Sequence, residues 1–105
     1  PFLCSGFALT EEGVADLVHF TKHMSHHPVR FTADYKPKKL KKALAKASKI
    51  NSGYTFILGE DEVKEKTVLM KNMETGEQKT YGQHEVFVIV KEILKSESEK
   101  ILKKS

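Results

Sequence analysis

Apolar and polar positions alternate along the chain in a pattern that predicts five strands and three helices. The five short segments predicted to be strands are residues 2–4, 29–32, 54–58, 67–71 and 78–81. Three longer segments carry apolar residues at helical spacing, and their predicted buried stripes are Val14, Leu17, Val18, Thr21 and Met24; Leu40, Ala43, Leu44 and Ala47; and Val86, Ile89, Val90, Ile93 and Leu94. The predicted order of elements is therefore β-α-β-α-β-β-β-α.

Turn and cap residues predict where these elements begin and end. Ser5-Gly6 should end the first strand, and Thr10 should cap the first helix, whose first turn carries two glutamates. Pro37 suits the first position of the second helix, and Asn51-Ser52-Gly53 should end that helix. We expect Gly82 to begin the last helix.

Connection lengths predict a mixed sheet. Helices join the first three strands, so right-handed crossovers should make these strands parallel. Short turns join the last three, so the fourth strand should run against its neighbours. The run from Tyr54 to Leu58 is apolar apart from Thr55 and should be a central strand that is buried on both faces. We place the domain at residues 1–95 and expect the charged tail, 96–105, to fray.

Composition places the chain among ordinary folded domains. Its 105 residues suffice for one domain, with 39% apolar and 30% charged residues. No run of about 18 apolar residues occurs, so we expect no membrane span, and the N-terminus does not have the pattern of a signal peptide. The single cysteine, Cys4, fits a cytoplasmic location. Because the chain begins with Pro1 instead of Met, we expect it to be part of a longer protein.

Positive charge is concentrated in one segment. The net charge is +4, and seven of the 18 basic residues lie in the acid-free window 36–49, namely Lys36, Lys38, Lys39, Lys41, Lys42, Lys46 and Lys49. Such a cluster attracts phosphates, although a simply solvated helix face would have the same composition.

No cluster of residues predicts catalysis or a metal site. Glu60, Asp61 and Glu62 are consecutive and point in different directions, whereas a hard cation needs converging oxygens. His19 and His23 stand one helical turn apart without the intervening glutamate of a zinc enzyme, so these two and His26 and His27 are interpreted as surface histidines. Nothing around Cys4 marks an activated thiolate.

Four segments together carry a family resemblance. These segments are Asp34-Tyr35, Leu40 to Leu44, Gly53 to Glu62 and Lys71 to Gln78. Their most specific parts are Ile57-Leu58-Gly59-Glu60-Asp61-Glu62 and, after it, Thr75-Gly76-Glu77-Gln78. In order and spacing the chain resembles the C-terminal anticodon-binding domain of histidyl-tRNA synthetases, which are class II aminoacyl-tRNA synthetases. The chain departs from the family at residues 23–28, where relatives usually have a Leu-Arg pair and a glycine.

The resemblance implies a fold and a set of binding residues. The fold would be a three-layer α/β/α domain with a mixed five-stranded sheet of order 2-1-3-4-5 and an antiparallel strand 4. By similarity with threonyl-type relatives, Glu62 and Lys71 would read anticodon bases. The residues that would complete the pocket are Gly6 and Phe7 in the loop after strand one, Pro37 and Lys38 at the start of the second helix, and Glu77 and Gln78. Lys39, Lys42 and Lys46 would contact phosphates.

Each of these assignments has a simpler alternative. Glu62 would be a surface ion-pair partner, Lys71 a solvated strand end, and Glu77 and Gln78 ordinary hairpin residues.

The resemblance also implies a function and partners. The chain would be a non-catalytic tRNA anticodon-binding module of histidyl-tRNA synthetase. Its partners would be the anticodon stem-loop of tRNA(His) and a catalytic domain of the same polypeptide, in a homodimeric parent enzyme that uses ATP and Mg²⁺. This chain itself would bind no cofactor. The alternative is a regulatory or interaction domain derived from a synthetase, as in a starvation-sensing kinase or an accessory subunit of a mitochondrial DNA polymerase.

Overall fold

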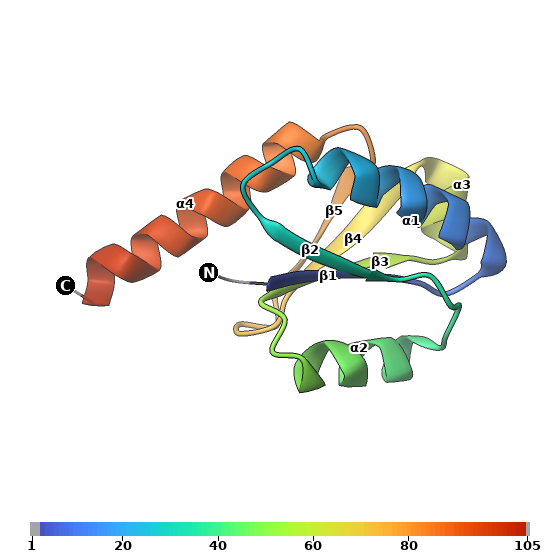
Figure 1. Ribbon diagram of the computed structural model, residues 1–105, viewed down its shortest axis with the longest axis horizontal. Coiled ribbons are helices and arrows are strands. Elements are labelled where there is room, and N and C mark those ends of the chain that lie inside the picture. Colours follow the sequence, from blue (N-terminus) through green and yellow to red (C-terminus); the bar gives the residue numbers. More distant parts are fainter. Residues whose placement is uncertain (1–2, 105) are drawn as a thin grey trace.

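The computed structural model describes residues 3–104, and it describes side chains as far as residue 99. The described residues form five strands and four helices. These elements are arranged in three layers (Figure 1). The strands are β1 (Leu3–Ala8), β2 (Arg30–Asp34), β3 (Tyr54–Leu58), β4 (Thr67–Asn72) and β5 (Gln78–Gly82). The helices are α1 (Glu11–Met24), α2 (Leu40–Lys49), α3 (Glu60–Glu65) and α4 (Val86–Lys104).

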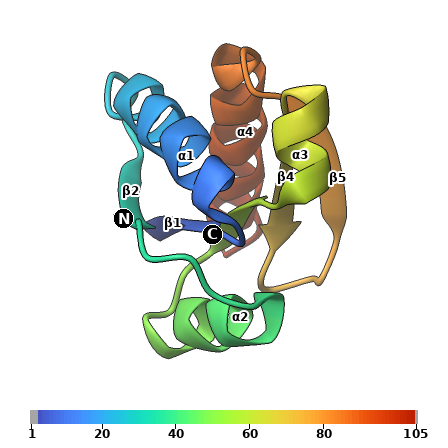
Figure 2. The ribbon, with the colours of Figure 1, turned by 90° about the vertical axis from the view of Figure 1, so that its right-hand side faces the viewer.

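The sheet has the predicted topology. Its order is β2-β1-β3-β4-β5, in which β1 is parallel to β2 and β3, and β4 is antiparallel to β3 and β5. Helices α1, α3 and α4 lie on one side of the sheet and α2 lies on the other (Figure 2). The fold class predicted from the sequence is confirmed.

The larger part of the core lies between the sheet and helices α1 and α4. Thr10 caps α1, since its Oγ1 accepts a hydrogen bond from the backbone N–H of Gly13 at 3.0 Å. The ring of Phe20 meets those of Phe31 and Phe56, with centroids 5.9 and 5.3 Å away. The other fully buried side chains of this cluster include Leu17, Met24, Leu58, Val68, Ile89 and Ile93.

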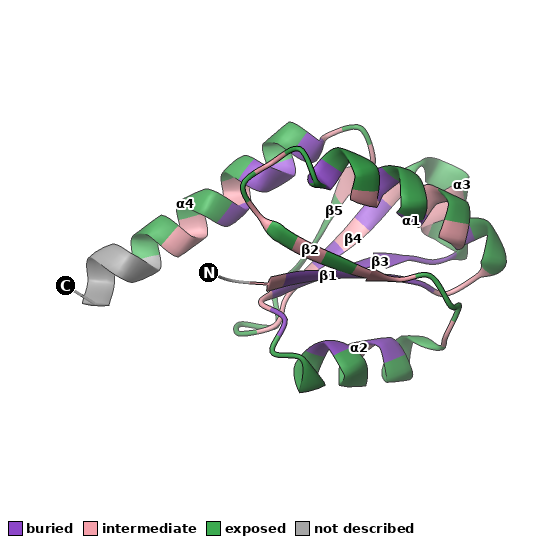
Figure 3. Ribbon diagram, viewed as in Figure 1, coloured by how far each residue is buried: buried purple, intermediate pink, exposed green. Residues whose placement is uncertain are grey.

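Two predicted members of the stripes on α1 and α4 are exposed. Val18 is 47% exposed, and Phe20 takes the buried position instead, because the face of α1 that meets the sheet is centred on Leu17, Phe20 and Met24. Leu94 is 37% exposed, whereas the other predicted α4 positions are buried. Figure 3 shows this buried band along the sheet-facing side of the helices.

The opposite face of the sheet carries a much smaller cluster. Ala43 and Ala47 of α2 pack on Phe7 and Ile57, and all four side chains are buried. Leu40, which was predicted to be buried, is 44% exposed. Alanine has a short side chain, so α2 buries little apolar area against the sheet.

Three predicted boundaries are wrong. β1 does not stop at Ser5-Gly6 but continues to Ala8, because Gly6 pairs with both neighbouring strands; Phe2 lies outside the described residues. α2 begins at Leu40 with Lys39 as its N-cap, so Pro37 lies in the preceding loop. Gly82 ends β5 and does not begin α4.

The remaining differences concern two helices. The acidic turn after β3 is the short helix α3, in which Gly59 is the N-cap and Glu62 completes the cap. α4 continues past Lys95 to Lys104, where we expected fraying, and the boundary between domain and tail stays a prediction. None of the helices in the described part of the chain has the length and apolar character needed to cross a membrane.

Candidate nucleic-acid interface

The lysine-rich segment forms a cavity on the α2 side of the molecule. The cavity has a volume of about 430 Å³ and is lined by Lys36, Pro37, Lys38, Lys39 and Lys42. Four of these five, namely Lys36, Pro37, Lys38 and Lys39, belong to the loop between β2 and α2, in which Lys39 is the N-cap of α2. The structure therefore brings Pro37, Lys38, Lys39 and Lys42 together, as the predicted site required, and adds Lys36.

Asp34, at the end of β2, holds two lysines of this segment. Its Oδ2 accepts hydrogen bonds from the ammonium groups of Lys38 and Lys46, the latter at 2.6 Å. Its Oδ1 accepts from the backbone N–H of Lys36 at 3.0 Å. Partial burial by itself would raise the pKa of Asp34, but the hydrogen bonds from Lys38 and Lys46 hold that pKa well below its usual range. Asp34 is therefore a permanent anion beside the lysines.

Lys71 lies on the same face of the sheet as α2. Leu69, two residues earlier in β4, packs against the Ala43 and Ala47 cluster, and alternate residues of a strand share a face. Gln78 is paired directly with Lys71 across the β4–β5 ladder, so it shares that face, and Glu77 is exposed beside it. The structure thus brings together Lys71 and Gln78 on the part of the sheet next to α2.

Glu62 lies elsewhere. Its Oε1 accepts a hydrogen bond from the backbone N–H of Gly59 at 2.8 Å, and α3 packs beside α1. If the β3–β4 register is continued past the Ile57–Leu69 pair, Gly59 lies opposite Thr67. Thr67 is four residues before Lys71 in β4, a distance of roughly 13 Å along the strand at about 3.3 Å per residue. Glu62 and Lys71 could share one pocket only if the segment after β3 folded back over the sheet edge on the α2 side. The described structure does not bring them together.

Gly6 and Phe7 do not lie in a loop, contrary to prediction. Both are inside β1, and Phe7 is only 2% exposed beneath α2. A Cβ atom at Gly6 would meet Leu17 Cδ1 at 2.7 Å and Phe31 Cζ at 2.8 Å. Gly6 and Phe7 are both packed inside the domain, so neither of them presents a side chain to a ligand.

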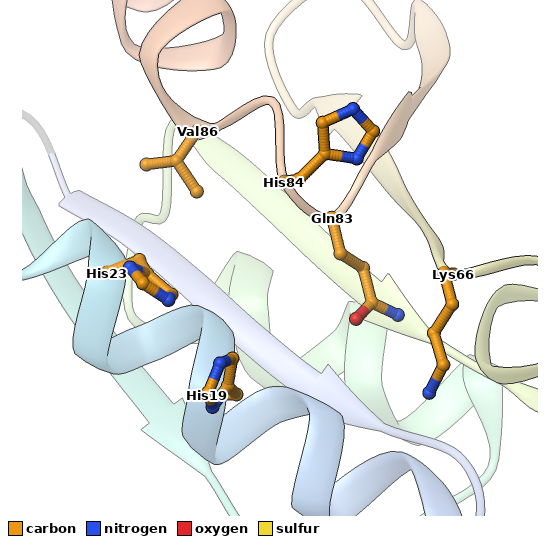
Figure 4. A pocket seen from close by; sticks show the side chains of 6 residues that line it. All are labelled: His19, His23, Lys66, Gln83, His84 and Val86. Atoms are coloured by element: carbon orange, nitrogen blue, oxygen red, sulfur yellow. The ribbon is translucent and has the colours of Figure 1, made fainter.

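A second cavity lies on the other side of the molecule. It has a volume of about 370 Å³, and Figure 4 shows the side chains that line it: His19, His23, Lys66, Gln83, His84 and Val86. Gln83 is fixed there, since its Nε2 donates to Asp16 Oδ2 at 2.8 Å and to the carbonyl oxygen of Thr67 at 3.0 Å. Helical spacing alone groups only His19 and His23, because Lys66 and His84 reach the cavity from other parts of the chain.

The described residues offer neither a metal site nor an activated thiol. No group of three or more His, Cys, Asp or Glu side chains among them is arranged to hold a metal ion. His19 and His23 meet edge to face, with ring centroids 4.9 Å apart. Burial, with a smaller contribution from Glu97, raises the pKa of the Cys4 thiol to about 12, so this thiol stays protonated at neutral pH.

The fold and the basic α2 face define a class: a three-layer α/β/α domain that presents clustered cations beside one half of its sheet. Residues 7–93 match the family model described as "Anticodon binding domain", and the chain belongs to that family. The sequence-based assignment to this family is confirmed.

Curated relatives point to the histidyl branch of the family. The chain is 30% identical over 91 residues to the histidine–tRNA ligase of Anoxybacillus flavithermus, covering 87% of this chain and 22% of the relative. It is 43% identical over 53 residues to the enzyme of Clostridium tetani, covering 50% and 12%. The resemblance stated from the sequence is confirmed, and the alternative of a non-synthetase protein is not favoured. The chain spans less than a quarter of the length of these relatives.

Solved structures share the fold. Apo histidyl-tRNA synthetase of Staphylococcus aureus superposes with a TM-score of 0.74 at 21% identity, covering 86% of this chain and 23% of that one. Prolyl-tRNA synthetase of Cryptosporidium parvum gives a TM-score of 0.81 at 14% identity, covering 99% and 22%.

Proposed function

We propose that this chain is the anticodon-binding module of a histidine–tRNA ligase and that it binds the anticodon stem-loop of tRNA(His). The observation that carries the proposal is the family match over residues 7–93, which includes the basic α2 face. Histidine attachment, with its ATP and Mg²⁺, would belong to a catalytic domain outside this chain. The complete enzyme would be a cytoplasmic homodimer.

The domain would make two kinds of contact with the RNA, to its phosphates and to its bases. Lys39 and Lys42, which line the α2 cavity, would attract backbone phosphates, which position an RNA without reading its sequence. Lys71 and Gln78 would meet unstacked bases, since an ammonium group donates to base carbonyls and an amide both donates and accepts. Glu62 would be a separate contact point at the α3 end, through the carboxylate oxygen that does not cap the helix.

The test compares anticodon discrimination with overall affinity. In the complete enzyme, Lys71→Ala should reduce the preference for tRNA(His) over an anticodon-substituted tRNA by about 5- to 150-fold, by analogy with a base-edge contact of about 1–3 kcal/mol. Lys42→Ala should weaken binding of both RNAs about equally. Competition binding of the two tRNAs measures both quantities.

Lys91→Ala is the matched control, because Lys91 lies on α4 with its ammonium group 5.5 Å from the centroid of the Phe87 ring. It should change neither quantity. If Lys71→Ala leaves the preference intact while Lys42→Ala weakens binding, Lys71 is not a base reader. If no α2 lysine affects binding and affinity does not change with salt, the proposed function itself is wrong.

A further inference from the structure

Asp34 joins the sheet to both ends of the basic segment. It is the last residue of β2 and its side chain is 14% exposed. One ammonium partner, Lys38, comes from the loop before α2, and the other, Lys46, comes from within α2. A single carboxylate therefore ties the loop and the helix to the end of the same strand.

Further hydrogen bonds restrain this loop. The backbone N–H of Lys38 donates to the carbonyl oxygen of Ala8 at 3.2 Å, and the ammonium group of Lys38 donates to the carbonyl oxygen of Lys36 at 3.2 Å. Lys38 is consequently only 16% exposed, although it lies on a lysine-rich surface. Lys46 is 51% exposed, so half of its side chain surface is in solvent while its charge is paired.

Five of the seven lysines of the segment thus fall into two groups. In the described residues, the ion pairs of the 36–49 segment are the two that Asp34 makes with Lys38 and Lys46. Lys36, Lys39 and Lys42 line the same cavity without an ion pair in that part of the chain. The charged side chains that act on Asp34 are those of Lys38 and Lys46. β1 contributes the uncharged residues Ser5 and Phe7 to the small cavity beside Asp34.

We propose that Asp34 is a positioning residue that removes Lys38 and Lys46 from phosphate binding and leaves Lys36, Lys39 and Lys42 as the phosphate contacts. This inference rests on the proposed function, because it concerns how the same surface binds RNA. A lysine that keeps its carboxylate partner releases no counterion from the RNA, so it does not contribute to the salt dependence of binding.

The salt dependence of RNA binding measures how many phosphates the protein neutralises. For single-stranded RNA, the slope of log affinity against log salt changes by about 0.7 for each phosphate neutralised. In the complete enzyme, Lys39→Ala and Lys42→Ala should each reduce the steepness by about that amount. Lys46→Ala and Lys38→Met should leave it nearly unchanged, although the sequence places all four lysines in one cluster.

Asp34→Asn is the decisive variant, since it keeps the side chain shape and removes the charge. Once released, Lys38 and Lys46 should steepen the slope by up to about 1.4, which is twice 0.7. Lys46→Ala, silent in the parent protein, should then reduce the slope when it is combined with Asp34→Asn. A purely structural role for Asp34 would not produce this dependence of one substitution on the other.

Asp61→Asn is the matched control, because it makes the same change of charge at an exposed position on α3. It should leave the slope unchanged. The single variants Lys38→Met and Lys46→Ala test the proposal even if Asp34→Asn does not fold, which circular dichroism would reveal.

The outcomes separate two failures. If Lys46→Ala reduces the slope in the parent protein as much as Lys42→Ala does, or if a folded Asp34→Asn protein keeps the parent slope, the role of Asp34 is overturned while RNA binding stands. If the parent protein shows no salt dependence at all, the proposed function fails with it.

Discussion

The two faces of the sheet are built differently. On one face, α1 and α4 bury large side chains, among them Phe20, Phe56 and Ile89, in a single cluster. On the other face, α2 rests on the sheet through Ala43 and Ala47, and most of its circumference carries lysines. Figures 1 and 2 show that α2 stands alone on its side.

This difference separates stability from binding within a domain of 105 residues. The face covered by α1 and α4 buries most of the apolar area, and apolar burial is the main favourable contribution to folding. The α2 face leaves β4 and β5 accessible next to a cluster of cations. Substitutions of buried residues on the first face should therefore change stability most, and substitutions of the exposed lysines on the second face should mainly change RNA binding.

The largest effect should come from Phe20→Ala. Because Phe20 is 2% exposed and contacts two other aromatic rings, its truncation should lower the free energy of unfolding by about 3–5 kcal/mol. Denaturant unfolding measures the loss. Val18→Ala on the same helix is the control and should cost less than about 0.5 kcal/mol. Similar losses for the two variants would contradict the assignment of the α1 face.

A smaller effect is expected at the closest approach of α1 to the sheet. A Cβ atom at Gly13 would lie 2.5 Å from the carbonyl oxygen of Leu58, so Gly13→Ala should destabilise by about 1–3 kcal/mol, although alanine normally favours a helix. The converse change on α2, Ala43→Gly, should also destabilise, by about 1–2 kcal/mol, from lower helix propensity and a lost buried methyl group. Thermal or denaturant unfolding compares them. Stabilisation by Gly13→Ala would show that α1 can move away from β3.

The smallest effect should come from the helix caps. α1 has a hydrogen-bonded cap at Thr10, whereas α2 has Lys39 at its N-cap without a side-chain hydrogen bond. Thr10→Ala should therefore cost about 1 kcal/mol, and Lys39→Ser should add up to about 1 kcal/mol of stability. Lys39→Ser should nevertheless weaken tRNA binding. Denaturant unfolding measures the stability of the two variants, and titration with tRNA measures their affinity. An unchanged affinity would remove Lys39 from the interface.

The site was less predictable than the fold. Residue type identifies the lysine segment, and the spacing around Lys71 and Gln78 matches the resemblance. The sequence pattern also predicts a loop at Gly6 and Phe7, where β1 in fact continues to Ala8. A glycine in a strand looks like a strand end in a single sequence, because the neighbours that require it, Leu17 and Phe31, come from other elements. The role of Asp34 was missed for the same reason, although an acid at a strand end beside a lysine run was a usable signal.

By itself, the amino-acid sequence determined the number of strands, the type of each long element and the mixed direction of the sheet, since these follow from local periodicity and connection length. It also determined that one segment would be basic. Only the tertiary structure decided that Glu62 and Lys71 lie apart, that Phe20 and not Val18 is buried, and that Asp34 pairs with Lys38 and Lys46. The physical reason is that each of these depends on how elements distant in the chain pack, and packing contacts leave no regular period in the sequence.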